Sequence, residues 1–105
     1  MFPETIQRYE IIDGDMKMPP APSLEHQWIT DSLVLKLRPF VQQRQLGVVV
    51  SAPVDVLIQR EPLRTRQPDV LFLSAARTGI RGREGLRGLQ TLNIAPDLVI
   101  EVLSP

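Results

Sequence analysis

The chain contains no cysteine among its 105 residues, which excludes a disulfide framework and any metal site built on thiolates. It has a single histidine, His26, so the ligands of a structural zinc site are missing as well. Positive and negative side chains balance to a net charge of zero, and no global attraction to nucleic acid or anionic lipid follows from it. The lack of cysteine is compatible with the cytosol, and we expect a cytoplasmic protein.

Long apolar runs and nucleotide-binding motifs are missing too. No basic region followed by an apolar stretch opens the chain, so a signal peptide is not indicated, and no run is long enough to span a bilayer. The sequence has no glycine-rich phosphate loop followed by Lys-Ser/Thr, no dinucleotide fingerprint and no serine nucleophile elbow. The length permits one small domain, residues 1–105, without membrane association.

Two short strands that each carry a carboxylate are the most informative pattern present. Residues 68–74 contain Asp69 and residues 96–105 contain Glu101, each in an otherwise apolar segment. Because alternate residues of a strand point to opposite faces, both faces of these strands are apolar, which favours central strands covered on both sides. A carboxylate there is costly unless it is paired, protonated or bound to a metal.

Asp69 and Glu101 are therefore candidate ligands of one cation. Adjacent strands lie about 5 Å apart, so two carboxylates on neighbouring strands can share an ion. Mg²⁺ (or Mn²⁺) takes oxygen ligands of this kind, and it can polarise a phosphodiester and activate water. The structural alternative is that Asp69 caps the strand entry and Glu101 pairs with an arginine. Asp97 lies about 13 Å along the strand from Glu101, so it is predicted to cap a turn instead.

The remaining pattern predicts an α/β (α+β) fold in which one long helix packs on a mixed sheet. An Asp-Gly turn between apolar runs predicts a β-hairpin over residues 9–18. A helix is predicted from the cap Ser23 to about residue 45, with a kink or break at Pro39 and a stop at Gly47. Two strands follow at residues 48–51 and 54–58, bent at Pro53, and then a polar loop at residues 59–67.

Two other groups could serve the same chemistry. His26, in the first turn of the predicted helix, is more often structural in such a position, but it could approach the sheet end as a proton carrier or metal ligand. Glycine recurs every third residue over 79–88, which predicts a mobile surface loop or an arm that contacts phosphates. The arginines in and before that loop are Arg60, Arg64, Arg66, Arg77, Arg81, Arg83 and Arg87.

These residues carry a resemblance to the Uma2 family, also known as DUF820, of restriction-endonuclease-like proteins. The similar segments, in the expected order, are residues 9–14 (YEIIDG), 18–22 (MPPAP), 26–29 (HQWI), 68–74 (PDVLFLS) and 95–105 (APDLVIEVLSP). The resemblance implies a PD-(D/E)xK nuclease core in which Asp69 is the first acid and Glu101 the second. It also implies a supporting acid on the helix, for which Glu25 beside His26 is the nearest candidate and Glu10 the second.

The lysine of that nuclease pattern falls on Leu103, and Lys17 and Lys36 are the only lysines present. The resemblance implies that the lysine comes from a helix after this strand, beyond Pro105, so we expect a fold that is incomplete at the C-terminus. The implied function is a magnesium-dependent DNA endonuclease, impaired in this chain. The alternative is an inactive nuclease-like fold that acts as a binding or dimerisation module, and an unfinished sheet edge leaves a homodimer open.

Overall fold

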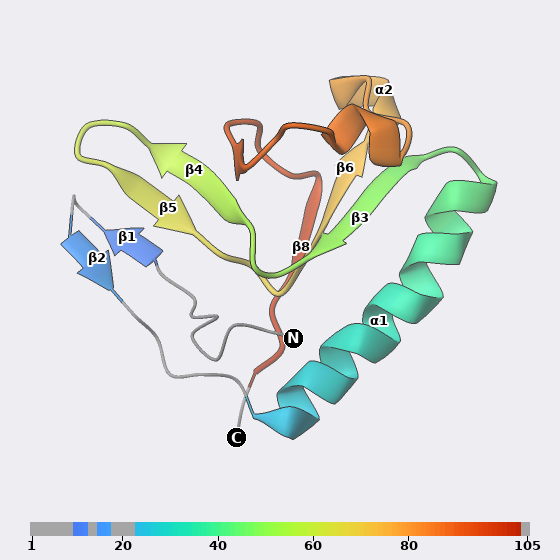
Figure 1. The fold of residues 1–105 in the computed structure, drawn as a ribbon, viewed down its shortest axis with the longest axis horizontal. Helices are drawn as coiled ribbons and strands as arrows, with labels where there is room; N and C mark the ends of the chain where they lie inside the picture. Colours follow the sequence, from blue (N-terminus) through green and yellow to red (C-terminus); the bar gives the residue numbers. More distant parts are fainter. Residues whose placement is uncertain (1–9, 13–14, 18–22, 104–105) are drawn as a thin grey trace.

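The computed structural model describes residues 10–12, 15–17 and 23–103, which form a long helix, two three-stranded sheets and a hairpin (Figure 1). The predicted α+β class is confirmed, as is the hairpin, whose strands pair antiparallel. In chain order the elements are β1 (Glu10–Ile12), β2 (Asp15–Lys17), α1 (Leu24–Gln43), β3 (Gly47–Ser51), β4 (Asp55–Gln59), β5 (Arg64–Arg66), β6 (Val70–Ser74), α2 (Ala75–Thr78), η1 (Arg83–Leu86), β7 (Thr91–Leu92) and β8 (Leu98–Ile100).

The strands after α1 divide between two sheets rather than one. The first has the order β3-β6-β8 with antiparallel pairs, and the second has the order β5-β4-β7, in which β4 and β7 are parallel. The division begins at Pro53, because proline has no N–H and cannot continue a ladder. The predicted polar loop at residues 59–67 was partly wrong, since β5 forms inside it and pairs with β4.

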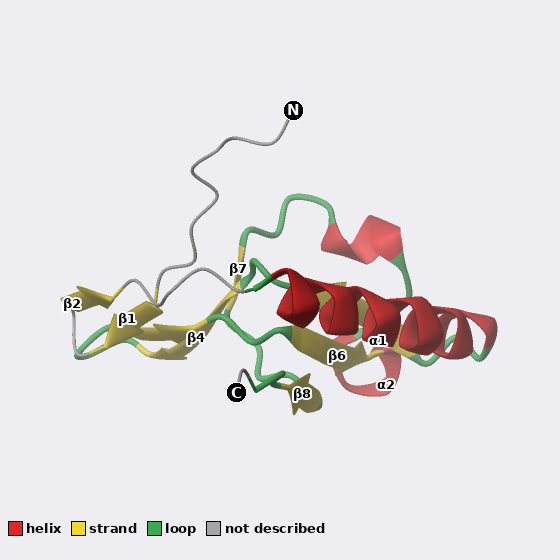
Figure 2. Ribbon diagram, turned by 90° about the horizontal axis from the view of Figure 1, so that it is seen from below, coloured by secondary structure: helices red, strands yellow, loops and turns green. Residues whose placement is uncertain are grey.

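Helix α1 lies against one face of the β3-β6-β8 sheet (Figure 2). The predicted cap is confirmed, because the Ser23 hydroxyl accepts a hydrogen bond from the His26 amide at 3.0 Å. Of the expected kink or break at Pro39, the break is wrong, since α1 continues to Gln43 with Pro39 inside it. Pro39 and Leu35 both lie on the exposed side, so water can satisfy the Leu35 carbonyl that the proline leaves without its helical donor.

The predicted helix stop at Gly47 is also wrong, because α1 ends at Gln43, four residues before it. Arg44 is the C-cap, and Gln45 takes the left-handed conformation with φ 53°. The Gln45 and Leu46 amides donate to the carbonyls of Gln42 and Val41, which is the Schellman arrangement. Gly47 instead opens β3 at a point where the backbone of β6 passes close by.

Strand β6 is the centre of the fold and contributes to two apolar layers. Val70 packs with Val41 and Val49 beneath α1, while Leu71 and Leu73 pack on the opposite face of the sheet. The predicted burial of this strand on both faces is therefore confirmed. The same prediction was wrong for β8, whose Leu98 and Val99 are 51% and 44% exposed, because β8 lies at the edge of its sheet in the described part of the chain.

Asp97 links the segment before β8 to the start of α2, so its partners lie far along the chain and not in the local turn that the sequence predicts it to cap. Its carboxylate accepts hydrogen bonds from the Ser74 amide at 2.8 Å and from the Ser74 hydroxyl at 3.0 Å. The Arg77 guanidinium donates through Nε at 3.1 Å and through a terminal nitrogen at 3.0 Å. Arg77 and then the Ser74 amide hold the pKa of Asp97 well below its ordinary value of 3.8.

Because the pKa of Asp97 is lowered by folding, its contribution to stability is present above pH 3.8 and is lost as the pH falls toward the folded-state value. We expect Asp97→Asn to lower the melting temperature at pH 7, and we expect its difference from wild type to shrink steadily as the pH falls below 3.8. Thermal unfolding followed by circular dichroism across this range measures the difference. Glu84→Gln, a change at an exposed acid of η1, is the control, and a difference at pH 7 that persists unchanged near pH 2 would refute the assignment.

Candidate functional site

The candidate site lies where α1 begins, β6 begins and β8 ends, at one end of the first sheet (Figure 1). Asp69 stands one residue before β6 and is only 3% exposed. Its Oδ2 atom accepts a hydrogen bond from the Val102 amide at 2.7 Å, and its carbonyl accepts one from the Ala52 amide at 2.9 Å. The side chain therefore ties the end of β8 to the start of β6.

His26 is the second group at this junction, as the sequence allowed. Its Nε2 atom lies 3.2 Å from Asp69 Oδ2, and the ring is 8% exposed. An ionised carboxylate only accepts hydrogen bonds, so the proton of the ring belongs on Nε2. The other ring nitrogen, Nδ1, is buried and has no hydrogen-bond partner within the described residues. His26 thus holds the Asp69 carboxylate from the helix side.

Glu101 follows β8 directly and lies at the same end of the sheet as Asp69. In the antiparallel pair, Val70 is opposite Ile100, which is the last pair of the ladder, and Asp69 and Glu101 are the next residues beyond it on the two segments. The two acid-bearing strands are therefore neighbours in one sheet. A shared role of the two carboxylates stays a prediction. Glu101 is exposed, whereas Asp69 is buried.

The other two acids are placed differently. Glu25 lies in the first turn of α1 with an exposed side chain, and its neighbour His26 makes the contact with Asp69. Glu10 lies in β1, and its side chain falls outside the described part of the chain. Within that part, no group of three or more histidine, aspartate or glutamate side chains converges. The described residues therefore offer two carboxylates at the sheet end and no larger cage.

Those two carboxylates suit a hard divalent ion. Mg²⁺ is commonly bound by one or two carboxylates together with water and substrate phosphates, so a larger set of protein ligands is not required. Asp69 is fixed by the Val102 amide and His26, and Glu101 is exposed. The chemistry of the donors therefore fits the predicted ion.

The glycine-rich arm lies at the opposite end of β6 from Asp69 (Figure 1). Asp69 precedes the first residue of this strand, whereas Arg77 and the arm follow its last residue, and five strand residues span about 17 Å. Arg77 is engaged with Asp97. Arg66, the last residue of β5 and exposed, precedes Asp69 by three positions in the chain.

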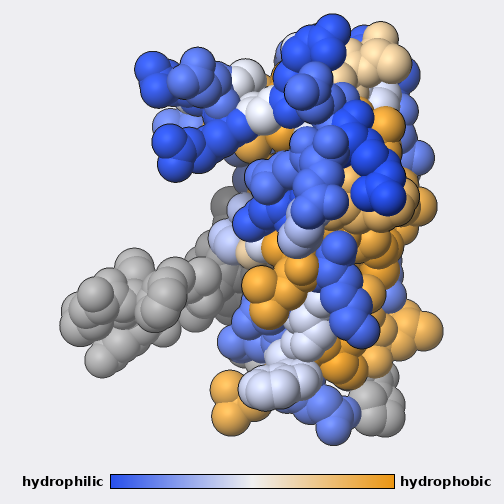
Figure 3. Space-filling model, turned by 90° about the vertical axis from the view of Figure 1, so that its right-hand side faces the viewer, coloured by the Kyte–Doolittle hydropathy of each residue, from blue (hydrophilic) through white to orange (hydrophobic). Residues whose placement is uncertain are grey.

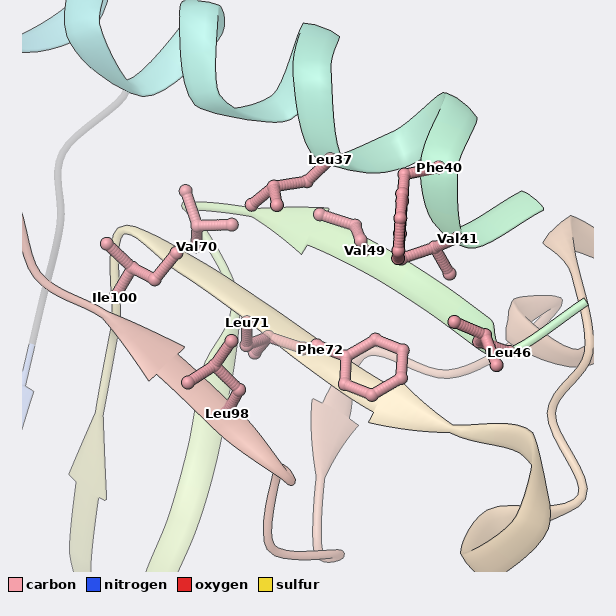
Figure 4. A pocket seen from close by; sticks show the side chains of 10 residues that line it. All are labelled: Leu37, Phe40, Val41, Leu46, Val49, Val70, Leu71, Phe72, Leu98 and Ile100. Carbon is pink, nitrogen blue, oxygen red and sulfur yellow. The ribbon is translucent and has the colours of Figure 1, made fainter. Parts of the chain in front are cut away.

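An apolar groove runs between the C-terminal half of α1 and the edge strand β8 (Figure 4). Phe40 and Leu46 stand on its helix side and Leu98 and Ile100 on its strand side, with Phe72 at its floor. The groove has no acidic or basic side chain in its lining. It is therefore a packing surface and is distinct from the candidate metal site.

The backbone donors that hold Asp69 could not be read from residue types. Every non-proline residue has a backbone N–H, so the sequence does not single out the amides of Val102 and Ala52. Only the pairing of β6 with β8 brings the Val102 amide to the Asp69 carboxylate. No helix in the described part of the chain has both the length and the apolar character needed to cross a bilayer.

Comparison with known families gives a match that covers nearly the whole chain. The model of the Uma2 family, described as "Putative restriction endonuclease", matches residues 2–105. No curated protein matches the chain. The matched range includes both carboxylates, His26 and all described strands.

Proposed function

This chain belongs to the Uma2 family, and we propose on that basis that it is a metal-dependent endonuclease acting on DNA phosphodiester bonds. The observation that supports the proposal is the antiparallel pairing of β6 with β8, whose last pair, Val70 and Ile100, has Asp69 and Glu101 as its next residues at one sheet end. Two carboxylates so placed are the donors expected for Mg²⁺ or Mn²⁺. Such an ion, when bound, polarises a phosphodiester and lowers the pKa of a coordinated water.

The chain's own residues divide the work of positioning. Asp69 is held rigidly, since the Val102 amide and His26 both engage Oδ2. Glu101 is exposed at the same end of the sheet, where it would complete the ligand set. Arg66 supplies positive charge three residues from Asp69, where a scissile phosphate would need it. The residue two positions after Glu101 is Leu103, so no lysine at that position can orient water, and we propose that cleavage by this chain is slow.

A plasmid-nicking assay tests the proposal. With protein in excess over supercoiled DNA, we expect slow nicking in Mn²⁺ or Mg²⁺ that is abolished by a chelator and reduced at least about 100-fold in Glu101→Gln, because electrostatic stabilisation by a metal supplies several kcal/mol. Glu84→Gln removes an exposed acid in η1, remote from the sheet end, and should cleave like wild type. Nicking that persists in the chelator, or that is equal in Glu101→Gln and wild type, would contradict it.

The second candidate is a binding or dimerisation module without catalysis. It is favoured by the exposed edge strand β8, whose Leu98 and Val99 remain half exposed beside the apolar groove. An uncovered strand edge of this kind is a template for pairing with another chain. Under this alternative the acids at the sheet end serve structure only, and the plasmid assay would show no metal-dependent nicking.

A further inference from the structure

The outward face of α1 is apolar, although it is turned away from the sheet. Leu24, Trp28 and Leu35 are 84%, 76% and 74% exposed. Their spacings of four and seven residues align them in one stripe along the helix, since about 3.6 residues make a turn. The buried residues of α1, His26, Thr30 and Val41, lie on the other side, against the sheet.

A helix that is apolar on two faces is normally covered on both. Single exposed apolar residues are ordinary on protein surfaces, but three large ones in a row form a continuous strip. α1 lies on the outside of the fold (Figure 2), and orange side chains gather among blue ones on the side of the molecule where it lies (Figure 3). The stripe therefore has the character of an interface rather than of a solvent-facing surface.

The charges beside the stripe indicate what covers it. Exposed acids, Glu25 and Asp31, lie in the N-terminal half of α1, and exposed bases, Lys36 and Arg38, lie in its C-terminal half. Such a helix is complementary to itself when two copies run antiparallel, because acids then face bases. The helix dipoles also oppose one another favourably in that orientation. A net charge of zero means that two copies do not repel each other over distance.

We propose that a second copy of this chain packs on the Leu24-Trp28-Leu35 stripe, with the two α1 helices antiparallel about a twofold axis near Asp31 and Ser32. In this arrangement Trp28 of each copy packs against Leu35 of the other. Glu25 and Lys36 lie on the same flank of the stripe, three turns apart, so the twofold brings Glu25 of one copy near Lys36 of the other. The contact is isologous, with each residue pair occurring twice.

The area available sets the strength of the dimer. A helix of 20 residues is about 30 Å long, and one of its faces offers less than the roughly 800 Å² per partner of a standard interface. The dimer is therefore expected to be concentration-dependent, with a dissociation constant in the micromolar range or weaker. This interface uses neither the candidate metal site nor the β8 edge, so its outcome is independent of the proposed nuclease activity.

Trp28 is the only tryptophan in the chain, which makes its fluorescence a direct reporter of the interface. Sedimentation velocity and Trp emission are measured together from micromolar to near-millimolar protein. We expect the mass to rise from monomer to dimer while the emission of wild type shifts to shorter wavelength with the same midpoint. Leu35→Glu should weaken association at least about thirtyfold, the effect of losing a central apolar contact, and should remove the spectral shift. Leu35 is exposed, so we expect Leu35→Glu to fold like wild type, which circular dichroism checks.

Charge reversal identifies the antiparallel register. Glu25→Lys and Lys36→Glu should each weaken the dimer a few-fold, and the double variant should recover wild-type affinity, as expected for an exposed ion pair. The control is Val99→Glu on the edge of β8, which should leave the dimer unchanged. A monomer at every concentration, or a dimer that survives Leu35→Glu and is lost in Val99→Glu, would overturn the proposal. A dimer that fails to recover in the double variant would overturn the register.

Discussion

Asp69→Ala is expected to abolish divalent-cation binding and to lower the free energy of unfolding by about 1–3 kcal/mol. Both effects follow from the position of this carboxylate. It is one of the two proposed ligands, and its Oδ2 atom also accepts from the Val102 amide at 2.7 Å and lies 3.2 Å from His26 Nε2. Alanine leaves both groups in a buried junction without this acceptor, and an unsatisfied buried donor costs the desolvation penalty of the group.

Asp69→Asn separates the two effects. The amide oxygen can still accept from the Val102 amide, so we expect urea unfolding to show a loss smaller than that of Asp69→Ala, while cation binding is lost with the charge. His26→Phe is the complementary change, since it removes the contact to Asp69 but keeps the carboxylate. It should retain binding, with reduced affinity because Asp69 is held less firmly. Asp69→Asn that binds the cation as tightly as wild type would refute the role of Asp69.

Gly47→Ala is expected to destabilise the fold by about 3 kcal/mol or more, because overpacking and backbone strain act together. A Cβ atom on Gly47 would lie 1.9 Å from the Leu73 carbonyl oxygen and 2.9 Å from the Ala75 amide nitrogen. These are backbone atoms of β6 and α2 and cannot move aside as a flexible side chain could. The φ of Gly47 is +148°, a conformation that residues with a Cβ rarely adopt.

Urea denaturation measures this loss, and it is large against the roughly 5–15 kcal/mol that stabilises a domain. Gly82→Ala is the matched control, because no atom lies within 4 Å of the added Cβ and φ is −166°, which any residue adopts. We expect that control to change stability by less than about 0.5 kcal/mol. Equal stability of Gly47→Ala and wild type would show that β3 does not approach β6 as closely as described.

The sequence predicted the elements with strong local signals. Ser23 was identified as a cap because its hydroxyl can serve the first helical amides, and the Asp-Gly turn was identified because it matches a hairpin. The burial of β6 on both faces followed from its unbroken apolar run. In each case the information lay within a few residues of the element.

Predictions that depended on tertiary contacts were less successful. The sequence predicts a helix stop at Gly47, but Gln45 is the residue that adopts the left-handed conformation. Gly47 lies instead where β3 passes too close to the backbone of β6 for a side chain to fit. The sequence predicts a kink or a break at Pro39, but packing against the sheet and an exposed Leu35 carbonyl allow the helix to continue without a break. Nothing local distinguishes the edge position of β8 from a central one, since only the strand order decides it.

The candidate site shows the same division. Asp69 and Glu101 stand out in the sequence as carboxylates in apolar segments, and the pairing of β6 with β8 brings those two segments side by side, while their shared role stays a prediction. The contact between His26 and Asp69 joins residues 43 positions apart. The sequence predicted either a purely structural histidine or one that approaches the sheet end, and it could not decide between the two. The glycine-rich arm was predicted to contact phosphates from its composition alone. It follows the last residue of β6, so it lies at the opposite end of the sheet from Asp69.

Calorimetric titration of the chain with Mn²⁺ tests the central claim most directly. One ion shared by Asp69 and Glu101, at the sheet end where β6 begins and β8 ends, predicts binding heat that saturates at one ion per chain in wild type. It predicts no saturable heat in Asp69→Asn, while Glu84→Gln should bind like wild type. Equal heats in wild type and Asp69→Asn, or no saturable heat in wild type, would contradict a cation site at this end of the sheet.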